Sequence, residues 1–124
     1  MKKIIYIIIG LIVVTGIVWL VVTPGKPGKY DDFAKCIRDL KTVIFYGAFW
    51  CPHCQAEKAR FGKSAQYLPY VECSTPDGQN QTQVCIDAGI KTYTTWQFGT
   101  SSASRVEGEM ELADLATRTS CPLP

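Results

Sequence analysis

The chain has 124 residues, 47% of them hydrophobic, and a formal net charge of +2. This length favours one small domain, and the composition argues against a disordered chain. Because four of the 13 basic residues lie in the first 29 positions, residues 30–124 hold more acidic than basic groups. A basic surface is therefore not expected there, which argues against nucleic-acid binding as the main function.

Residues 4–22 form an uncharged apolar run without proline. As an α-helix, these nineteen residues span about 28 Å, close to the roughly 30 Å hydrocarbon core of a membrane. A cleaved signal peptide is the alternative, but its apolar core is usually about 7–15 residues and is followed by an A-x-A-like site, which this run lacks. We therefore predict a transmembrane anchor over residues 1–23, and Lys2 and Lys3 favour a cytoplasmic amino terminus.

The stretch TPGKPGK that follows is rich in proline and glycine, which is typical of a tether. We place this linker at residues 24–29 and the soluble domain at residues 30–124. The predicted elements of the domain alternate between helices and strands. We expect helices at about 32–40, 51–66, 82–88 and 109–117, and strands at about 43–46, 68–73, 94–98 and 105–106. This order, with its terminal hairpin, predicts an α/β sandwich with a mixed sheet.

Six cysteines lie in the soluble domain, and the apolar run has none. An even number of cysteines in a small domain behind a membrane anchor favours an oxidising compartment and disulfide bonds. We therefore expect a single-pass protein of the cytoplasmic membrane with its carboxy-terminal domain on the extracytoplasmic side. The sequence allows fifteen full pairings of these residues. They are Cys36, Cys51, Cys54, Cys73, Cys85 and Cys121.

The motif Trp50-Cys51-Pro52-His53-Cys54 carries the expected chemistry. Pro52 suits the first turn of a helix, so Cys51 lies at the helix start, where free N–H groups and the positive dipole end stabilise a thiolate. Cys54 follows one turn later and can close a disulfide, and His53 adds a positive charge. Stabilising the thiolate favours the reduced form, which makes the disulfide a better oxidant. We predict a catalytic site of these four residues, Cys51 to Cys54.

Two other interpretations of the motif remain open, a structural disulfide and half of a zinc site. A zinc site needs a second C-x-x-C or an H-x-H partner, and the sequence has neither. We therefore expect no metal and no cofactor other than the redox-active disulfide.

The segments FYGAFWCPHCQAEKARFG, PYVEC and GIKTYTTW, with a polar PDG loop and Cys85 between them, resemble the thioredoxin-like domain fused to bacterial and plant vitamin K epoxide reductase homologues. The resemblance covers about residues 33–123. It implies a thioredoxin-like three-layer sandwich with a mixed four-stranded sheet, here preceded by one transmembrane helix. It also implies that Cys51 is the exposed sulfur that attacks and is attacked, and that Cys54 is the resolving sulfur.

The same resemblance implies the partners. Domains of this family take electrons from exported cysteine-containing proteins as these acquire disulfides, and pass them to a membrane oxidoreductase that reduces a quinone. The quinone-reducing module is expected to be a separate membrane protein here, because one anchor helix cannot supply it.

Two positions depart from the family pattern. Thr94 stands where the family has a cis-proline opposite the C-x-x-C motif, which leaves the peptide isomer before Thr94 open. Phe45 stands where ordinary thioredoxins carry a buried acid. Glu57 is a possible substitute, but we expect it to be an exposed helix residue. Trp50, Tyr93 and Thr94 are the candidates for substrate contact, and Trp50 is also expected to shield the disulfide.

The remaining four cysteines are expected to form structural disulfides. A loop of about a dozen residues between Cys73 and Cys85 is easily bridged. Cys36 and Cys121 are then left to join the two ends of the domain. Two alternatives stay open, a pair that shuttles electrons to Cys51 and Cys54, and free cysteines that pair between molecules.

The leading functional hypothesis is a membrane-anchored thiol–disulfide oxidoreductase that oxidises exported proteins. The first alternative is a reductase or isomerase of the same fold, which runs electrons in the other direction. The second is a non-catalytic binding module in which the cysteines only stabilise the fold.

Overall fold

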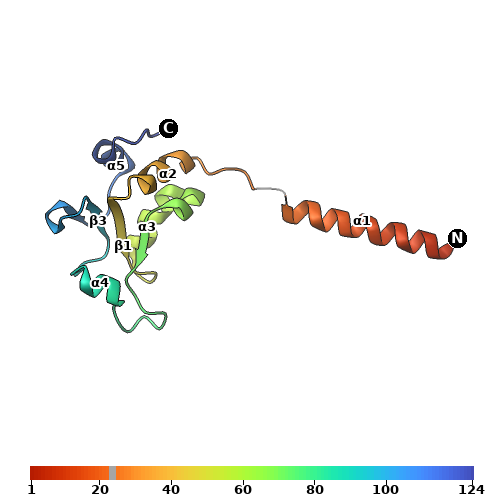
Figure 1. Cartoon of the computed structure of the whole chain (residues 1–124), viewed down its shortest axis with the longest axis horizontal. Coiled ribbons are helices and arrows are strands. Elements are labelled where there is room, and N and C mark those ends of the chain that lie inside the picture. Colours follow the sequence, from red (N-terminus) through yellow and green to blue (C-terminus); the bar gives the residue numbers. More distant parts are fainter. Residues whose placement is uncertain (23–24) are drawn as a thin grey trace.

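The computed structural model describes residues 1–22 and 25–124 (Figure 1). Helix α1 (Lys2–Val22) contains a 19-residue segment, Lys2–Leu20, that is long and apolar enough to cross a membrane. Its mean hydropathy is 2.5, and none of it is buried against the rest of the chain. The predicted boundary between anchor and linker falls on residues 23–24, outside the described residues, so the division into three segments stays a prediction.

The centre of the domain is a four-stranded sheet in the order β2-β1-β3-β4. Strand β1 pairs in parallel with β2 and antiparallel with β3, and β3 pairs antiparallel with β4. The apolar run VIFY makes β1 a central strand, because both of its faces are covered. This mixed sheet confirms the predicted fold class. The strands are β1 (Val43–Gly47), β2 (Tyr70–Glu72), β3 (Thr95–Phe98) and β4 (Arg105–Glu107).

Helices cover both faces of the sheet, which gives three layers. On one face, Val43 and Phe45 of β1 pack in a cluster with Phe33 of α2, Phe61 of α3 and Leu115 of α5. On the other face, a smaller cluster around Tyr46 includes α4. The helices are α2 (Asp31–Asp39), α3 (Pro52–Phe61), α4 (Gln83–Asp87) and α5 (Leu112–Thr119), with 3-10 turns η1 (Gly62–Tyr67) and η2 (Ser102–Ser104).

Two helix boundaries differ from the prediction. The helix expected to reach Gln66 ends at Phe61, because Gly62 has a φ of 56°, a left-handed value that an α-helix does not accept, and the chain continues as the 3-10 turn η1. The last helix begins at Leu112 rather than at Glu109. The Glu109 carboxylate is bound to His53 and Arg60, which holds this residue outside the helix. The C-cap of α4 is Ala88 rather than the predicted Gly89, which follows it with a left-handed φ of 67°.

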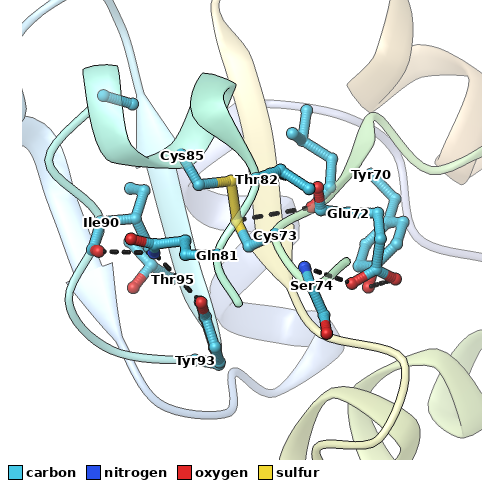
Figure 2. The surroundings of a disulfide bond; sticks show 12 residues. Tyr70, Glu72, Cys73, Ser74, Gln81, Thr82, Cys85, Ile90, Tyr93 and Thr95 are labelled. Atoms are coloured by element: carbon cyan, nitrogen blue, oxygen red, sulfur yellow. Dashed lines mark hydrogen bonds between the residues drawn. A yellow bond between two sulfur atoms is a disulfide. The ribbon is translucent and has the colours of Figure 1, made fainter. Parts of the chain in front are cut away.

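Two disulfides join separate elements of the domain. Cys36 of α2 is bonded to Cys121, which follows α5. Cys73, directly after β2, is bonded to Cys85 of α4 (Figure 2). Both Cys73 and Cys85 are fully buried in the smaller cluster. The remaining two cysteines, Cys51 and Cys54, are free thiols in the structure.

Candidate functional site

The site is built on the turn that connects β1 to α3. Strand β1 ends at Gly47, and the N–H of Cys51 donates to the carbonyl of Ala48 at 3.0 Å. Cys51 is the N-cap of α3 with extended backbone angles, and Pro52 occupies the first turn. This is the arrangement that the motif predicts, because proline tolerates the helix start, where no N–H partner is needed. The Cys51 sulfur therefore lies at the positive end of α3.

Both thiols of the motif are buried. The exposed fraction is 5% for Cys51 and 1% for Cys54. Burial is the main cause that raises the pKa of Cys54 to about 12, and a hydrogen bond with Cys51 adds to it, while a backbone hydrogen bond at Ala48 acts in the opposite direction. Cys54 is therefore a neutral thiol at pH 7.

Cys51 is less exposed than expected. The reason is the segment before β3, where the Cys51 sulfur lies 3.8 Å from the carbonyl oxygen of Tyr93. The peptide bond between Tyr93 and Thr94 is cis, so the isomer that the sequence left open has the geometry of the family's cis-proline. The Thr94 side chain is fully buried, and its hydroxyl has no hydrogen-bond partner among the described residues. Thr94, a predicted substrate contact, therefore offers no exposed surface to a substrate.

An aromatic rim, which we define as Phe49, Trp50 and Tyr93, borders the motif. Phe49 and Trp50 are each 48% exposed, and the ring centroids of Trp50 and Tyr93 are 5.9 Å apart in an edge-to-face contact. The indole N–H of Trp50 donates to the Ser74 hydroxyl at 2.8 Å. The Gln81 amide donates to the Tyr93 hydroxyl at 3.0 Å (Figure 2). Ser74 and Gln81 thus position the rim from the loop that the Cys73–Cys85 disulfide closes.

His53 faces away from this rim, toward the segment before α5. Its Nδ1 lies 2.8 Å from a carboxylate oxygen of Glu109, and its side chain is 69% exposed. Arg60 binds the other oxygen of Glu109 at 2.8 Å and also contacts Glu111. The hydrogen bonds from His53 and Arg60 lower the pKa of Glu109. The Glu109 carboxylate therefore lies directly beside His53, the residue that the motif predicts to add a positive charge next to Cys51.

Glu57 is the clearest correction to the sequence-based expectations. It was expected to be exposed, but its side chain is fully buried. One carboxylate oxygen accepts the indole N–H of Trp96 and the other accepts the backbone N–H of Met110, both at 3.0 Å. Burial raises the pKa of Glu57. The local sequence carries no signal for this, because both partners are far along the chain.

Glu72 was not predicted to have a role and lies directly beside the motif. Its carboxylate accepts hydrogen bonds from the backbone N–H of Ser74 at 2.9 Å and from the Tyr70 hydroxyl at 2.8 Å (Figure 2). It also accepts the backbone N–H of Phe49 at 3.2 Å. One side chain thus connects strand β2 to the turn that carries Cys51. Within residues 1–22 and 25–124, no three His, Cys, Asp or Glu side chains lie together as a set of metal ligands.

Comparison with known proteins agrees with this geometry. The sequence model of the thioredoxin family matches residues 26–120. The thiol-disulfide oxidoreductase LTO1 of Arabidopsis thaliana is 44% identical over 79 residues, which cover 60% of this chain and 20% of that protein. The chain therefore spans about a fifth of the length of this relative.

Proposed function

Because the chain belongs to the thioredoxin family and resembles part of a thiol-disulfide oxidoreductase, we propose that it is itself a thiol–disulfide oxidoreductase. In this proposal, Cys51 and Cys54 are its redox-active pair and it oxidises cysteines of exported proteins. The observation that carries this proposal is the position of two free thiols at the N-cap and in the first turn of α3, with the Cys51 sulfur next to the carbonyl of Tyr93. His53, Pro52, Trp50, Tyr93 and Thr94 surround or support this pair.

The reaction proceeds through a mixed disulfide. A substrate thiolate attacks the Cys51 sulfur of the oxidised pair, a new sulfur–sulfur bond forms, and the bond between Cys51 and Cys54 breaks with its electron pair on Cys54. A second substrate thiolate attacks the substrate sulfur of this intermediate and releases Cys51. The substrate leaves with a disulfide, and the pair holds two electrons and two protons as a dithiol. Attack at Cys51 is favoured because Cys54 is the more deeply buried sulfur.

The direction of electron flow is supported by the helix. Cys51 is the N-cap of α3, at the positive end of the helix dipole, and this is the placement from which the motif predicts an oxidising disulfide. The reduction potential of the Cys51–Cys54 pair is measured in the full-length chain in detergent. Glutathione buffers set the potential, and alkylation with peptide mapping separates the three cysteine pairs. We expect about −120 to −180 mV, the range of disulfide donors. A value near about −270 mV points to the reductase alternative.

We expect C51A to lose turnover, because Cys51 is the sulfur that the substrate attacks. Retained activity in C51A, or no exchange between Cys51–Cys54 and glutathione in the wild-type chain, contradicts the proposal and leaves the structural disulfide as the better interpretation of this pair. The similarity to a thiol-disulfide oxidoreductase favours an enzyme over the non-catalytic module.

We also propose where the protein works. Helix α1 anchors the domain on the extracytoplasmic side of the cytoplasmic membrane, and a separate quinone-linked membrane oxidoreductase reoxidises the pair. The apolar helix and the resemblance to domains fused to vitamin K epoxide reductase homologues support this assignment. Alkylation trapping of the pair in membranes, before and after quinone depletion, tests it. We expect the reduced form to accumulate, and an unchanged ratio contradicts the quinone-linked partner.

A further inference from the structure

The surroundings of Cys54 contain a cation that none of the predicted roles uses. Lys58 follows Cys54 by four residues on α3, so the two side chains lie on the same face of the helix. The Lys58 ammonium lies 3.2 Å from the centre of the Tyr70 ring. The Cys54 sulfur and the Tyr70 ring edge lie 2.8 and 2.9 Å from the point where a side chain on Gly47 would begin. Cys54, Tyr70 and Lys58 therefore form one compact group.

The charges that act on this group come from two elements. From β2, Glu72 accepts the Tyr70 hydroxyl and attracts the Lys58 ammonium. From α3, Cys51 and Lys58 act on Cys54, and of these the Lys58 charge lowers its pKa. Burial in turn lowers the pKa of Lys58, whereas Glu72 and Cys54 raise it.

The two remaining titratable groups of α3 near the motif are directed elsewhere. Glu57 binds Trp96 and Met110, and His53 faces Glu109. Lys58 is therefore the side chain positioned to compensate a negative charge on Cys54.

We propose that Lys58 is a positioning residue for disulfide exchange, whose ammonium, placed by the Tyr70 ring and Glu72, stabilises Cys54 as the leaving thiolate. The inference rests on the proposed roles of Cys51 and Cys54. When a substrate thiolate attacks Cys51, the electron pair of the broken bond passes to the Cys54 sulfur. This sulfur is charged at the moment when it is still buried, next to Lys58. It then takes a proton from solvent, and the substrate remains bonded to Cys51.

This role predicts a separation of rate from equilibrium. A thiolate with a lower pKa is a better leaving group, so removing the cation slows the breaking of the Cys51–Cys54 bond. In the final dithiol, Cys54 is protonated at pH 7, so Lys58 has little effect on the equilibrium between the oxidised and reduced pair. A variant that only disturbs packing does not produce this separation.

The test compares four full-length proteins in detergent, namely wild type, K58M, K58R and K35M. K58M keeps the apolar contact with Tyr70 and removes the charge, whereas K58R keeps the charge. Lys35 is the matched control, because it makes the same kind of contact with the Tyr67 ring, 4.5 Å from its centre, on α2. Dithiothreitol, which attacks as its thiolate, reduces the oxidised pair in all four proteins at the same pH, with quenching by alkylation and mapping of the Cys51 and Cys54 peptides.

We expect K58M to be reduced about 3- to 10-fold more slowly than wild type, with an unchanged reduction potential at pH 7. K58R and K35M are expected to stay within about twofold of wild type, since both keep a cation beside Tyr70. As a second measurement, the ultraviolet absorbance of the Cys54 thiolate is titrated in C51A. Adding K58M to that background is expected to raise the pKa of Cys54, because the Lys58 charge that lowers it is removed.

Three results overturn the inference: an unchanged rate in K58M, an equal slowing in K58R, or an unchanged Cys54 titration. If K58M does not fold, K58Q replaces it in both measurements. The failure of the proposed function is recognised separately, because in that case the wild-type pair does not exchange at all, while the titration of Cys54 in C51A still reports on Lys58.

Discussion

At the scale of single residues, Glu57 shows how a buried carboxylate joins distant parts of the chain. It lies on α3, and its two oxygens accept N–H groups from Trp96 on β3 and from Met110 before α5. Each of these donors is buried, so each needs an acceptor. Glu57 therefore connects the helix that carries the motif to the sheet and to the carboxy-terminal segment.

We expect E57Q to reduce the free energy of unfolding by about 1–3 kcal/mol, because the amide offers one acceptor oxygen where the carboxylate offers two. Urea unfolding of the full-length chain in detergent measures this difference. The exposed Glu107 on β4 supplies the control variant E107Q, which we expect to change stability by less than about 0.5 kcal/mol. Equal stability of E57Q and wild type contradicts the assignment.

The effect of E57Q is also expected to depend on pH. Burial raises the pKa of Glu57 above its ordinary value of 4.5, so the folded state binds the proton more tightly than the unfolded state. The stabilising contribution of this group is complete below pH 4.5 and falls as the pH rises through the pKa of the folded state. The stability difference between wild type and E57Q is therefore larger at pH 4 than at pH 8. A difference that grows with pH contradicts the shift.

At the scale of elements, the site depends on how closely α3 approaches the end of β1. Gly47 is the last residue of β1, and a Cβ there would lie 2.8 Å from the Cys54 sulfur and 2.9 Å from the Tyr70 ring. Contacts this short force the neighbours to move. The Tyr70 ring is in turn packed on Phe45, with centroids 5.2 Å apart, so it has little room to shift.

We therefore expect G47A to lower the free energy of unfolding by about 1–3 kcal/mol, the usual cost of overpacking, and to slow reduction of the Cys51–Cys54 disulfide. The control is G25A in the linker, since a Cβ on Gly25 meets no atom within 4 Å. Urea unfolding and the dithiothreitol assay measure the two effects. If G47A behaves like G25A in both, the close packing of Cys54 against β1 is not needed for the site.

The elements were predictable from local patterns, and their ends were predictable only where the cause is local. The run VIFY identifies β1, and the proline after Cys51 identifies the start of α3. The early end of α3 depends on the backbone angles of Gly62, and the late start of α5 depends on partners that hold Glu109 outside the helix. Periodicity reports neither.

The site was predictable in the same degree. The motif itself gives the position of the two sulfurs, because their spacing is a local property of a helix start. The buried Glu57 and the group around Lys58 were missed, since their contacts come from β2, β3 and the segment before α5. A charged helix residue such as Glu57 or Lys58 is assigned to the surface when its tertiary partners are unknown.

At the scale of the whole molecule, the two disulfides constrain the chain to different extents. Cys36 and Cys121 are separated by 85 residues, so their bond joins the two ends of the domain, whereas Cys73 and Cys85 are separated by 12. In the chain-entropy description, the longer loop loses more freedom in the unfolded state. Replacing each pair by alanine is expected to cost about 4.6 kcal/mol for the first and about 3 kcal/mol for the second.

Urea unfolding of C36A/C121A and C73A/C85A measures the two costs against the wild-type chain. The order of the two values is the sharper part of the prediction, because the two variants differ strongly in the length of the loop that is opened. A larger loss for C73A/C85A means that local packing in the smaller cluster outweighs the constraint on the unfolded chain.

The orientation of the whole chain across a membrane gives the last prediction. Lys2 and Lys3 lie at the start of the apolar helix and favour a cytoplasmic amino terminus, and the two disulfides need an oxidising compartment for the domain. In a bacterial host, we therefore expect protease added to spheroplasts to digest the domain, and the domain to be protected in inverted membrane vesicles. A cytoplasmic marker protein that stays intact in the spheroplasts is the control.

Deleting residues 1–23 is expected to move the domain to the soluble fraction with its structural cysteines reduced, since it then remains in the cytoplasm. Protection of the full-length domain in spheroplasts contradicts the orientation, and it also removes the basis for exported proteins as substrates.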